Sequence, residues 1–141
     1  MQDDRRKQGF GNIRRIHPAR VVLSGHDKRF LRVASFLLAR RGFHVSAAPT
    51  NGELMGLLER TPVDVVVIDG SNSLSTAATT AAALCALHPA VRVLIATENG
   101  NPGWRGGHRV IEKWRGFEDL ADEVERAHVA LDNDTTSLEP G

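Results

Sequence analysis

The sequence predicts a single α/β domain built on a parallel sheet, and three observations carry this prediction. The stretch Val63-Asp64-Val65-Val66-Val67-Ile68-Asp69-Gly70 is a run of β-branched residues that ends on a carboxylate. Such a run, without polar alternation, is typical of a strand covered on both faces. Similar short apolar runs alternate with helical patterns along the chain. Finally, a length of 141 residues, 41% of them hydrophobic and 25% charged, fits one globular domain.

The elements follow one another in the order β-α-β-α-β-α-β-loop-β-α. The predicted strands cover residues 20–24, 43–47, 64–69, 91–97 and 109–112. The predicted helices cover residues 27–42, 51–60, 74–87 and 117–131. Asp27 is the expected N-cap of the first helix, and Gly42 is its expected stop. Residues 98–107 contain four glycines and one proline, so a loop is expected there in place of a helix.

Right-handed crossovers place helices on both faces of such a sheet. The compact solution for five parallel strands is the flavodoxin-like, doubly wound order 2-1-3-4-5. In that order the carboxyl ends of strands one, three, four and five meet at one edge. The turn 24–27, Asp69, Thr97 and Lys113 are therefore expected to lie together.

The regions outside this domain are polar. Residues 1–19 form a basic arm without periodicity, residues 20–131 form the domain, and residues 132–141 form a polar tail. The net charge of +1 argues against a general nucleic-acid binder, and the basic residues between 5 and 20 suggest nucleic acid only weakly. The lone Cys85 favours a reducing cytoplasm, and neither a signal peptide nor a membrane-spanning run is predicted.

The residues gathered at the sheet edge suit phosphoryl chemistry. An aspartate such as Asp69 can form an acyl phosphate, a hydroxyl such as that of Thr97 can hydrogen-bond a phosphoryl oxygen, and the ammonium of Lys113 can pair with either. The alternative is a structural Asp69–Lys113 ion pair, with Thr97 present for its β-propensity.

These positions resemble the receiver domain of bacterial two-component response regulators over roughly residues 20–130. The resemblance is carried by Pro62-Val63-Asp64 to Asp69, by Thr97 and Lys113 at the ends of their strands, and by Gly42-Phe43-His44-Val45 after the first helix. It implies that Asp69 is the phosphoacceptor and that Thr97 and Lys113 contact the phosphoryl group. It also implies a non-enzymatic role in phosphorelay signalling, with a sensor kinase or a regulatory target as the protein partner.

The chain departs from the family pattern where receivers carry two adjacent acids that hold Mg²⁺. Ser24-Gly25 or Gly25-His26 stands there, and Asp27 is the one nearby acid, a weak candidate ligand for Mg²⁺. Trp114 stands where a cis proline usually follows the lysine, and the helix between strands four and five is expected to be shortened or replaced by the Gly-rich loop 98–107. These departures favour a second interpretation, a phosphorylation-independent pseudo-receiver that acts by binding a protein partner or by forming a homodimer.

Two further patterns remain open. Cobalamin-binding domains share this fold and carry Asp-x-His-x-x-Gly after strand one, so His26 is a less favoured cobalt ligand. Trp104 and Trp114 flank the Gly-rich segment and either pack against the sheet or form a partner-binding patch. The other histidines lack the spacing of a zinc site.

Overall fold

The computed structural model describes residues 18–98, 103–105, 108–113 and 120–128. The helices are α2 (Lys28–Arg40), α3 (Asn51–Arg60) and α4 (Leu74–Leu87), with a further helical segment at residues 120–128. The strands are β1 (Arg20–Ser24), β2 (His44–Ala48), β3 (Val65–Asp69), β4 (Arg92–Thr97), β5 (Gly103–Arg105) and β6 (His108–Glu112). None of these helices is long and apolar enough to cross a membrane.

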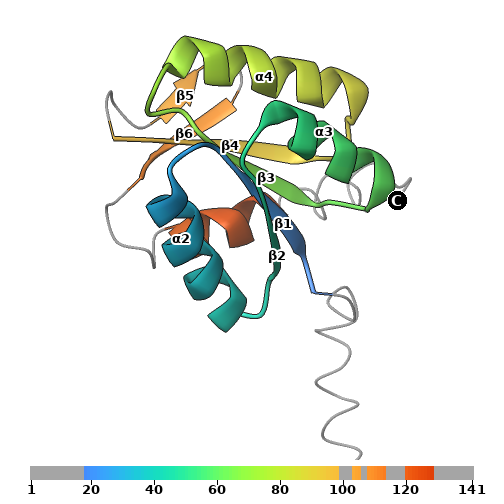
Figure 1. The fold of residues 1–141 in the computed structure, drawn as a ribbon, viewed down its shortest axis with the longest axis vertical. Coiled ribbons are helices and arrows are strands. Elements are labelled where there is room, and N and C mark those ends of the chain that lie inside the picture. The colour runs from blue at the N-terminus through green and yellow to red at the C-terminus, as the bar shows by residue number, and fades with distance from the viewer. Residues whose placement is uncertain (1–17, 99–102, 106–107, 114–119, 129–141) are drawn as a thin grey trace, which may run out of the picture.

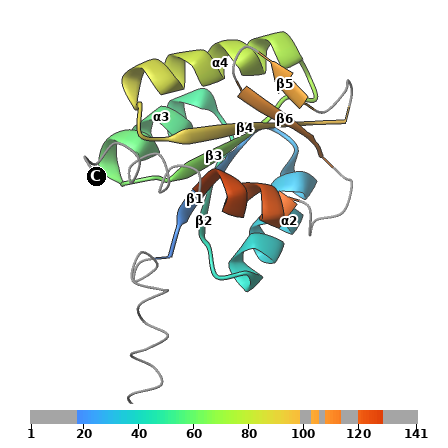
Figure 2. The ribbon, with the colours of Figure 1, turned by 180° about the vertical axis from the view of Figure 1, so that it is seen from behind.

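The sheet confirms the predicted topology. Its order is β2-β1-β3-β4-β6-β5, and the first five of these strands are parallel, which is the flavodoxin-like arrangement 2-1-3-4-5. Helices α3 and α4 cover one face of the sheet, while α2 and residues 120–128 cover the other (Figure 1). The same two layers flank the sheet when it is viewed from behind (Figure 2).

The Val65–Ile68 run is buried on both faces, as its composition predicts. Val65 and Val67 pack into the cluster under α2 and residues 120–128, whereas Val66 and Ile68 pack into the cluster under α3 and α4. All four side chains are 6% exposed or less. β3 is therefore the central strand that both hydrophobic clusters share.

The N-caps explain why the helices begin where they do. Asp27 accepts a hydrogen bond from the Phe30 N–H at 3.1 Å, as predicted from the sequence. Thr50 and Ser73 cap α3 and α4 in the same way. The last helix was predicted from residue 117 to 131, and only residues 120–128 of it are described, where Leu120, Ala121 and Val124 are buried.

Several predicted ends differ from the observed ones by one or two residues, and two differences go further. The predicted loop 98–107 contains the three-residue strand β5, which pairs antiparallel with β6 and adds a sixth strand to the sheet. A three-residue strand is too short to show periodicity, so the glycines around it dominated the pattern. In addition, Ala19, which was assigned to the arm, is 7% exposed, and its carbonyl accepts the His44 N–H at 2.9 Å. The folded part thus includes Ala19, while residues 1–17 and 132–141 lie outside the described residues.

Candidate functional site

The predicted site residues meet at the carboxyl edge of the sheet. Asp69 is the last residue of β3 and Thr97 is the last residue of β4. Lys113 directly follows β6, and its backbone N–H donates to the Thr97 carbonyl at 3.0 Å. The parallel register between β3, β4 and β6 thereby brings three residues from distant parts of the chain to one place.

The Lys113 ammonium is the centre of this cluster. Its Nζ lies 2.7 Å from Asp27 Oδ2 and 2.8 Å from Asp69 Oδ2, and it donates to Ser71 Oγ at 3.3 Å. The Lys113 side chain is 1% exposed and the Asp69 side chain 7%, against 31% for Asp27. The ammonium also lies 5.1 Å from the centroid of the Phe30 ring, a distance suited to a cation–π contact. We name Asp27, Asp69, Ser71 and Lys113 the lysine cluster.

Both oxygens of each aspartate in the lysine cluster already accept hydrogen bonds. Asp69 Oδ1 accepts the Ser71 N–H at 3.0 Å, while Oδ2 accepts from Lys113. Asp27 Oδ1 accepts the Phe30 N–H, while Oδ2 accepts from Lys113. The helix cap and the ion pair therefore use the same carboxylate, which ties the start of α2 to the end of β6.

Gly25 lies directly against the Asp69 side chain. A Cβ placed on Gly25 would stand 2.5 Å from Asp69 Cβ, and the φ angle of Gly25 is +151°. No side chain larger than hydrogen fits between the β1–α2 turn and Asp69 without a shift of one of them. An acid at position 25 is therefore incompatible with this packing.

The ion pairs of the lysine cluster shift the pKa values of Lys113 and Asp27 in the directions that keep both groups charged. Burial lowers the pKa of Lys113, but its hydrogen bonds and ion pairs with Asp27 and Asp69 outweigh burial and raise the pKa above its ordinary value. The hydrogen bond from Lys113 and the backbone N–H of Phe30 lower the pKa of Asp27. Lys113 is thus held as an ammonium, and Asp27 as a carboxylate, across the neutral pH range.

The acidic oxygens of the lysine cluster converge on Lys113 and are not arranged as a ligand set for Mg²⁺. Such an ion needs near-octahedral oxygen ligation, usually through one or two free carboxylates. Here the Asp27 and Asp69 oxygens that converge do so on Lys113 Nζ, and the remaining oxygen of each accepts a backbone N–H. Among the described residues, no group of three or more His, Cys, Asp or Glu residues is arranged to hold a metal ion.

The remaining candidate residues lie in several different elements. Thr97 is 1% exposed at the end of β4. His26 is exposed in the bend between β1 and α2, and Trp104 lies in β5, while Trp114 lies outside the described residues.

Two residues that contact or approach Lys113 were not predicted from the sequence. They are Ser71 and Glu98, and Glu98 Oε2 lies 4.0 Å from Lys113 Nζ. Both could have been found as polar residues just after a strand end, since Ser71 lies two positions after Asp69 and Glu98 directly follows Thr97.

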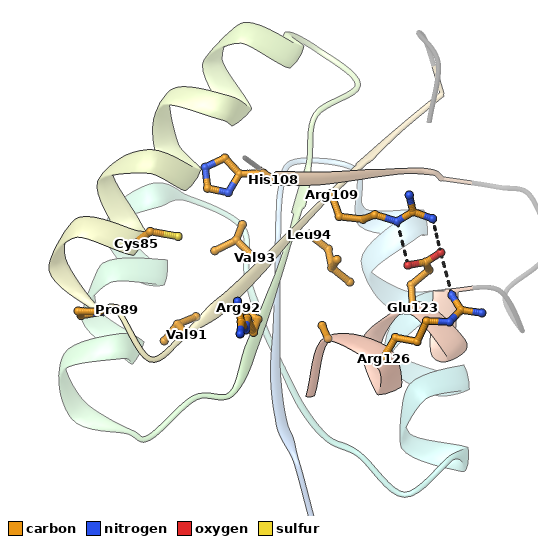
Figure 3. A pocket seen from close by; sticks show the side chains of 11 residues that line it. Cys85, Pro89, Val91, Arg92, Val93, Leu94, His108, Arg109, Glu123 and Arg126 are labelled. Carbon is orange, nitrogen blue, oxygen red and sulfur yellow. Dashed lines mark hydrogen bonds and ion pairs between the residues drawn. The ribbon is translucent and has the colours of Figure 1, made fainter. Parts of the chain in front are cut away.

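A cavity of about 760 Å³ lies elsewhere on the molecule, beside the first half of β4 and the start of β6 (Figure 3). Cys85, Val93 and His108 line one side of it, and Arg109, Glu123 and Arg126 line the other. Glu123 binds Arg109 at 2.9 and 3.2 Å and Arg126 at 3.1 Å. Burial raises the pKa of the Cys85 thiol. No sequence motif points to this cavity, because four separate elements contribute to it.

Comparison with known proteins connects this fold to a family of structures. No family model and no curated protein matches the chain. A response regulator from Thermotoga maritima has 15% identity and a TM-score of 0.71, covering 80% of this chain and 99% of that one. A CheY-like receiver domain protein from Methanospirillum hungatei has 15% identity and a TM-score of 0.72, covering 84% and 99%.

A third solved structure is the response regulator TrrA from Thermotoga maritima, which is in complex with Mg²⁺–BeF. It has 13% identity and a TM-score of 0.66, covering 77% of this chain and 98% of that one. At these identities the comparisons establish that the chain has the fold of response-regulator receiver domains. They confirm the resemblance predicted from the sequence at the level of structure.

Proposed function

We propose that this domain is a receiver-like signalling module that acts through protein–protein contact and does not depend on phosphorylation of Asp69. The observation that carries the proposal is the position of the Lys113 ammonium between Asp27 and Asp69, at 2.7 and 2.8 Å. Each oxygen of Asp69 accepts one hydrogen bond and its side chain is 7% exposed, so the ion pair and the burial both oppose attack of this carboxylate on a phosphodonor.

The charge balance supports the same proposal. Lys113 is one cation facing three carboxylates, those of Asp27, Asp69 and Glu98. A phosphoryl group on Asp69 would add negative charge beside Asp27 and Glu98. Phosphoryl transfer ordinarily relies on cations to neutralise such charge. In this cluster the cation that contacts Asp69 is the Lys113 ammonium, so neutralisation of a phosphoryl group would depend on that single positive charge.

A second candidate function is phosphorylation of Asp69, with Thr97 and Lys113 contacting the phosphoryl group. It is favoured by the position of all three residues at the carboxyl edge of adjacent strands, and by the direct contact between Lys113 and Asp69. Cobalamin binding through His26 is the least favoured candidate, and it predicts a change in the cobalamin absorption spectrum on mixing.

One experiment separates the first two candidates. The wild-type chain and Asp69→Asn are incubated with Mg²⁺ and acetyl phosphate and compared by intact mass, and in parallel with beryllofluoride by chemical shift. We expect no phosphoryl adduct on either protein and no change of chemical shift on addition of beryllofluoride to either. An adduct on the wild type that Asp69→Asn lacks would contradict the proposal and establish the second candidate.

A binding experiment tests the protein-contact part of the proposal. The wild-type chain and Asp69→Asn are used as baits for host proteins, and both are expected to recover the same partner with equal yield. A partner that binds only after treatment with acetyl phosphate would contradict the proposal. Equal recovery by Asp69→Asn and the wild type also serves as the control that the variant is folded.

A further inference from the structure

The solvent face of α2 carries an aromatic side chain among cations. Its buried face is made by Phe30, Leu31, Ala34 and Leu38. On a helix of 3.6 residues per turn, Arg29, Arg32, Phe36 and Arg40 fall opposite these residues. All four are exposed, and Phe36 is 61% exposed. We name these four residues the basic stripe.

The exposed Phe36 is unusual because it stands at the centre of the polar face. The Arg40 guanidinium carbon lies 5.7 Å from the centroid of its ring, so a cation already stacks on one part of it. An exposed aromatic flanked by arginines is the combination that stacks nucleobases and pairs with phosphates.

The charge of α2 is one-sided. The helix contains Lys28 and the three arginines of the basic stripe, and it contains no acidic residue. The whole chain has a net charge of only +1, so this positive charge is segregated rather than general. Arg41, just beyond the helix, binds Asp122 at 3.1 Å and lies outside the stripe.

The sequence that precedes the described residues is also rich in positive charge. Residues 1–17 contain Arg5, Arg6, Lys7, Arg14 and Arg15 against Asp3 and Asp4. The described chain begins beside the end of α2, since the Ala19 carbonyl accepts the N–H of His44, which lies four residues after Arg40. Three arginines spread along one face of α2 favour a long polyanion over a small anion.

We propose that the basic stripe binds the phosphodiester backbone of a nucleic acid, with Phe36 stacking on a base. From Arg29 to Arg40 the helix rises by about 16 Å, enough to face several successive phosphates. The stripe lies on a different element from Asp69, so binding is expected to be the same in Asp69→Asn and in the wild type. This inference therefore stands apart from the function proposed above.

Binding of nucleic acid to the basic stripe can be measured by fluorescence anisotropy with the full chain. The probes are labelled oligothymidine of 20 nucleotides and a labelled duplex of 20 base pairs, which is about two helical turns long. We expect binding at 50 mM NaCl that weakens steeply at 200 mM. Arg29→Ala/Arg32→Ala should weaken binding about tenfold and lower the salt slope by about 2. Phe36→Ala should weaken binding of the single strand more than that of the duplex.

Arg60→Ala is the matched control, because Arg60 is an exposed arginine at the end of α3, on the other face of the sheet. It should bind as the wild type does, and circular dichroism should show all variants folded. Equal affinity of the stripe variants and the wild type would overturn the proposal, as would loss of all binding on deletion of residues 1–17 alone. Equal competition by polyglutamate, or binding only to phosphatidylserine vesicles, would assign the stripe to another class of partner.

Discussion

At the scale of single residues, Lys113 supplies the positive charge that pairs with the two aspartates of the site. Its ammonium is nearly inaccessible to solvent and contacts two carboxylates, one of them on the 7%-exposed side chain of Asp69. Replacing it by Met keeps the aliphatic length but leaves the Asp69 carboxylate buried without its cation. We expect Lys113→Met to lower the free energy of unfolding by about 3–5 kcal/mol, measured by urea denaturation.

The matched control is a double variant that also removes the buried, unpaired carboxylate of Asp69. Asp69→Asn in the Lys113→Met background takes away the buried carboxylate, so the double variant should be more stable than Lys113→Met alone. If the changes in the free energy of unfolding caused by Lys113→Met and Asp69→Asn simply add, Lys113 and Asp69 are not coupled in the folded state, and their ion pair does not stabilise the lysine cluster.

Gly25 allows a second prediction at this scale. Gly25→Ala places a Cβ 2.5 Å from Asp69 Cβ at a φ of +151°, so both contact and backbone strain oppose it. Gly42→Ala is the control, because Gly42 has a φ of +95° but no atom within 4 Å of its would-be Cβ. We expect Gly25→Ala to cost about 2 kcal/mol or more and Gly42→Ala about 1 kcal/mol, both from denaturation midpoints. Equal costs would mean that the contact with Asp69 is easily relieved.

The sequence could predict some of these residues and not others. Asp69, Thr97 and Lys113 each end a strand or directly follow one, so the parallel topology alone brings them together. The turn that contains Asp27 was predicted to lie near Lys113, but the split of the Asp27 carboxylate between Lys113 and the N-cap of α2 was not, because it depends on the path of the turn after β1. The contact between Gly25 and Asp69 is hidden for the same reason: a glycine in a turn gives no sign of what lies against it.

At the scale of elements, the pairing of Glu123 with Arg109 joins the helical residues 120–128 to β6. The hydrogen bond from Arg109 lowers the pKa of Glu123, and partial burial opposes this lowering without reversing it. A carboxylate whose pKa is lowered on folding stabilises the fold above its ordinary pKa of 4.5, and this contribution is lost as the pH falls through the lowered pKa.

We therefore expect Glu123→Gln to destabilise the protein by about 1–2 kcal/mol at pH 7. The gap from the wild type should close as the pH falls from 4.5 through the lowered pKa, because the carboxyl of the folded wild type then becomes neutral as well. Urea denaturation at a series of pH values measures both curves. Arg126→Gln is the control, since Arg126 is 68% exposed and its ion pair should contribute little. A gap that stays constant with pH would assign the loss to packing instead of charge.

The element boundaries show where periodicity is informative. The helix at α4 was predicted over residues 74–87, where it lies, and the structure shows Ser73 and His88 as its two caps. Strand β5 was missed because three residues between glycines carry no pattern, and their pairing with β6 is a tertiary effect. Antiparallel pairing with β5 also covers the edge of β6 that would otherwise be open at residues 108–110.

At the scale of the whole molecule, the fold follows from one strand that is apolar on both sides. β3 contributes Val65 and Val67 to one hydrophobic cluster and Val66 and Ile68 to the other. The run of β-branched residues was enough to predict a strand between two layers, and the alternation of elements was enough to predict the strand order. The cavity beside β4 and β6 was beyond prediction, because its shape depends on how four elements pack.

Because the two clusters share β3, we expect them to unfold together. Phe30 is buried in the cluster under α2, and Leu84 is buried in the cluster under α3 and α4. Phe30→Ala should cost about 3–5 kcal/mol and Leu84→Ala about 2–5 kcal/mol. Each should lower the midpoint of a single calorimetric transition whose calorimetric and van't Hoff enthalpies agree. Leu87→Ala is the control, since Leu87 is 64% exposed and should change the midpoint little. Two separate transitions, with each variant shifting only one of them, would show that the layers unfold independently and that β3 does not couple them.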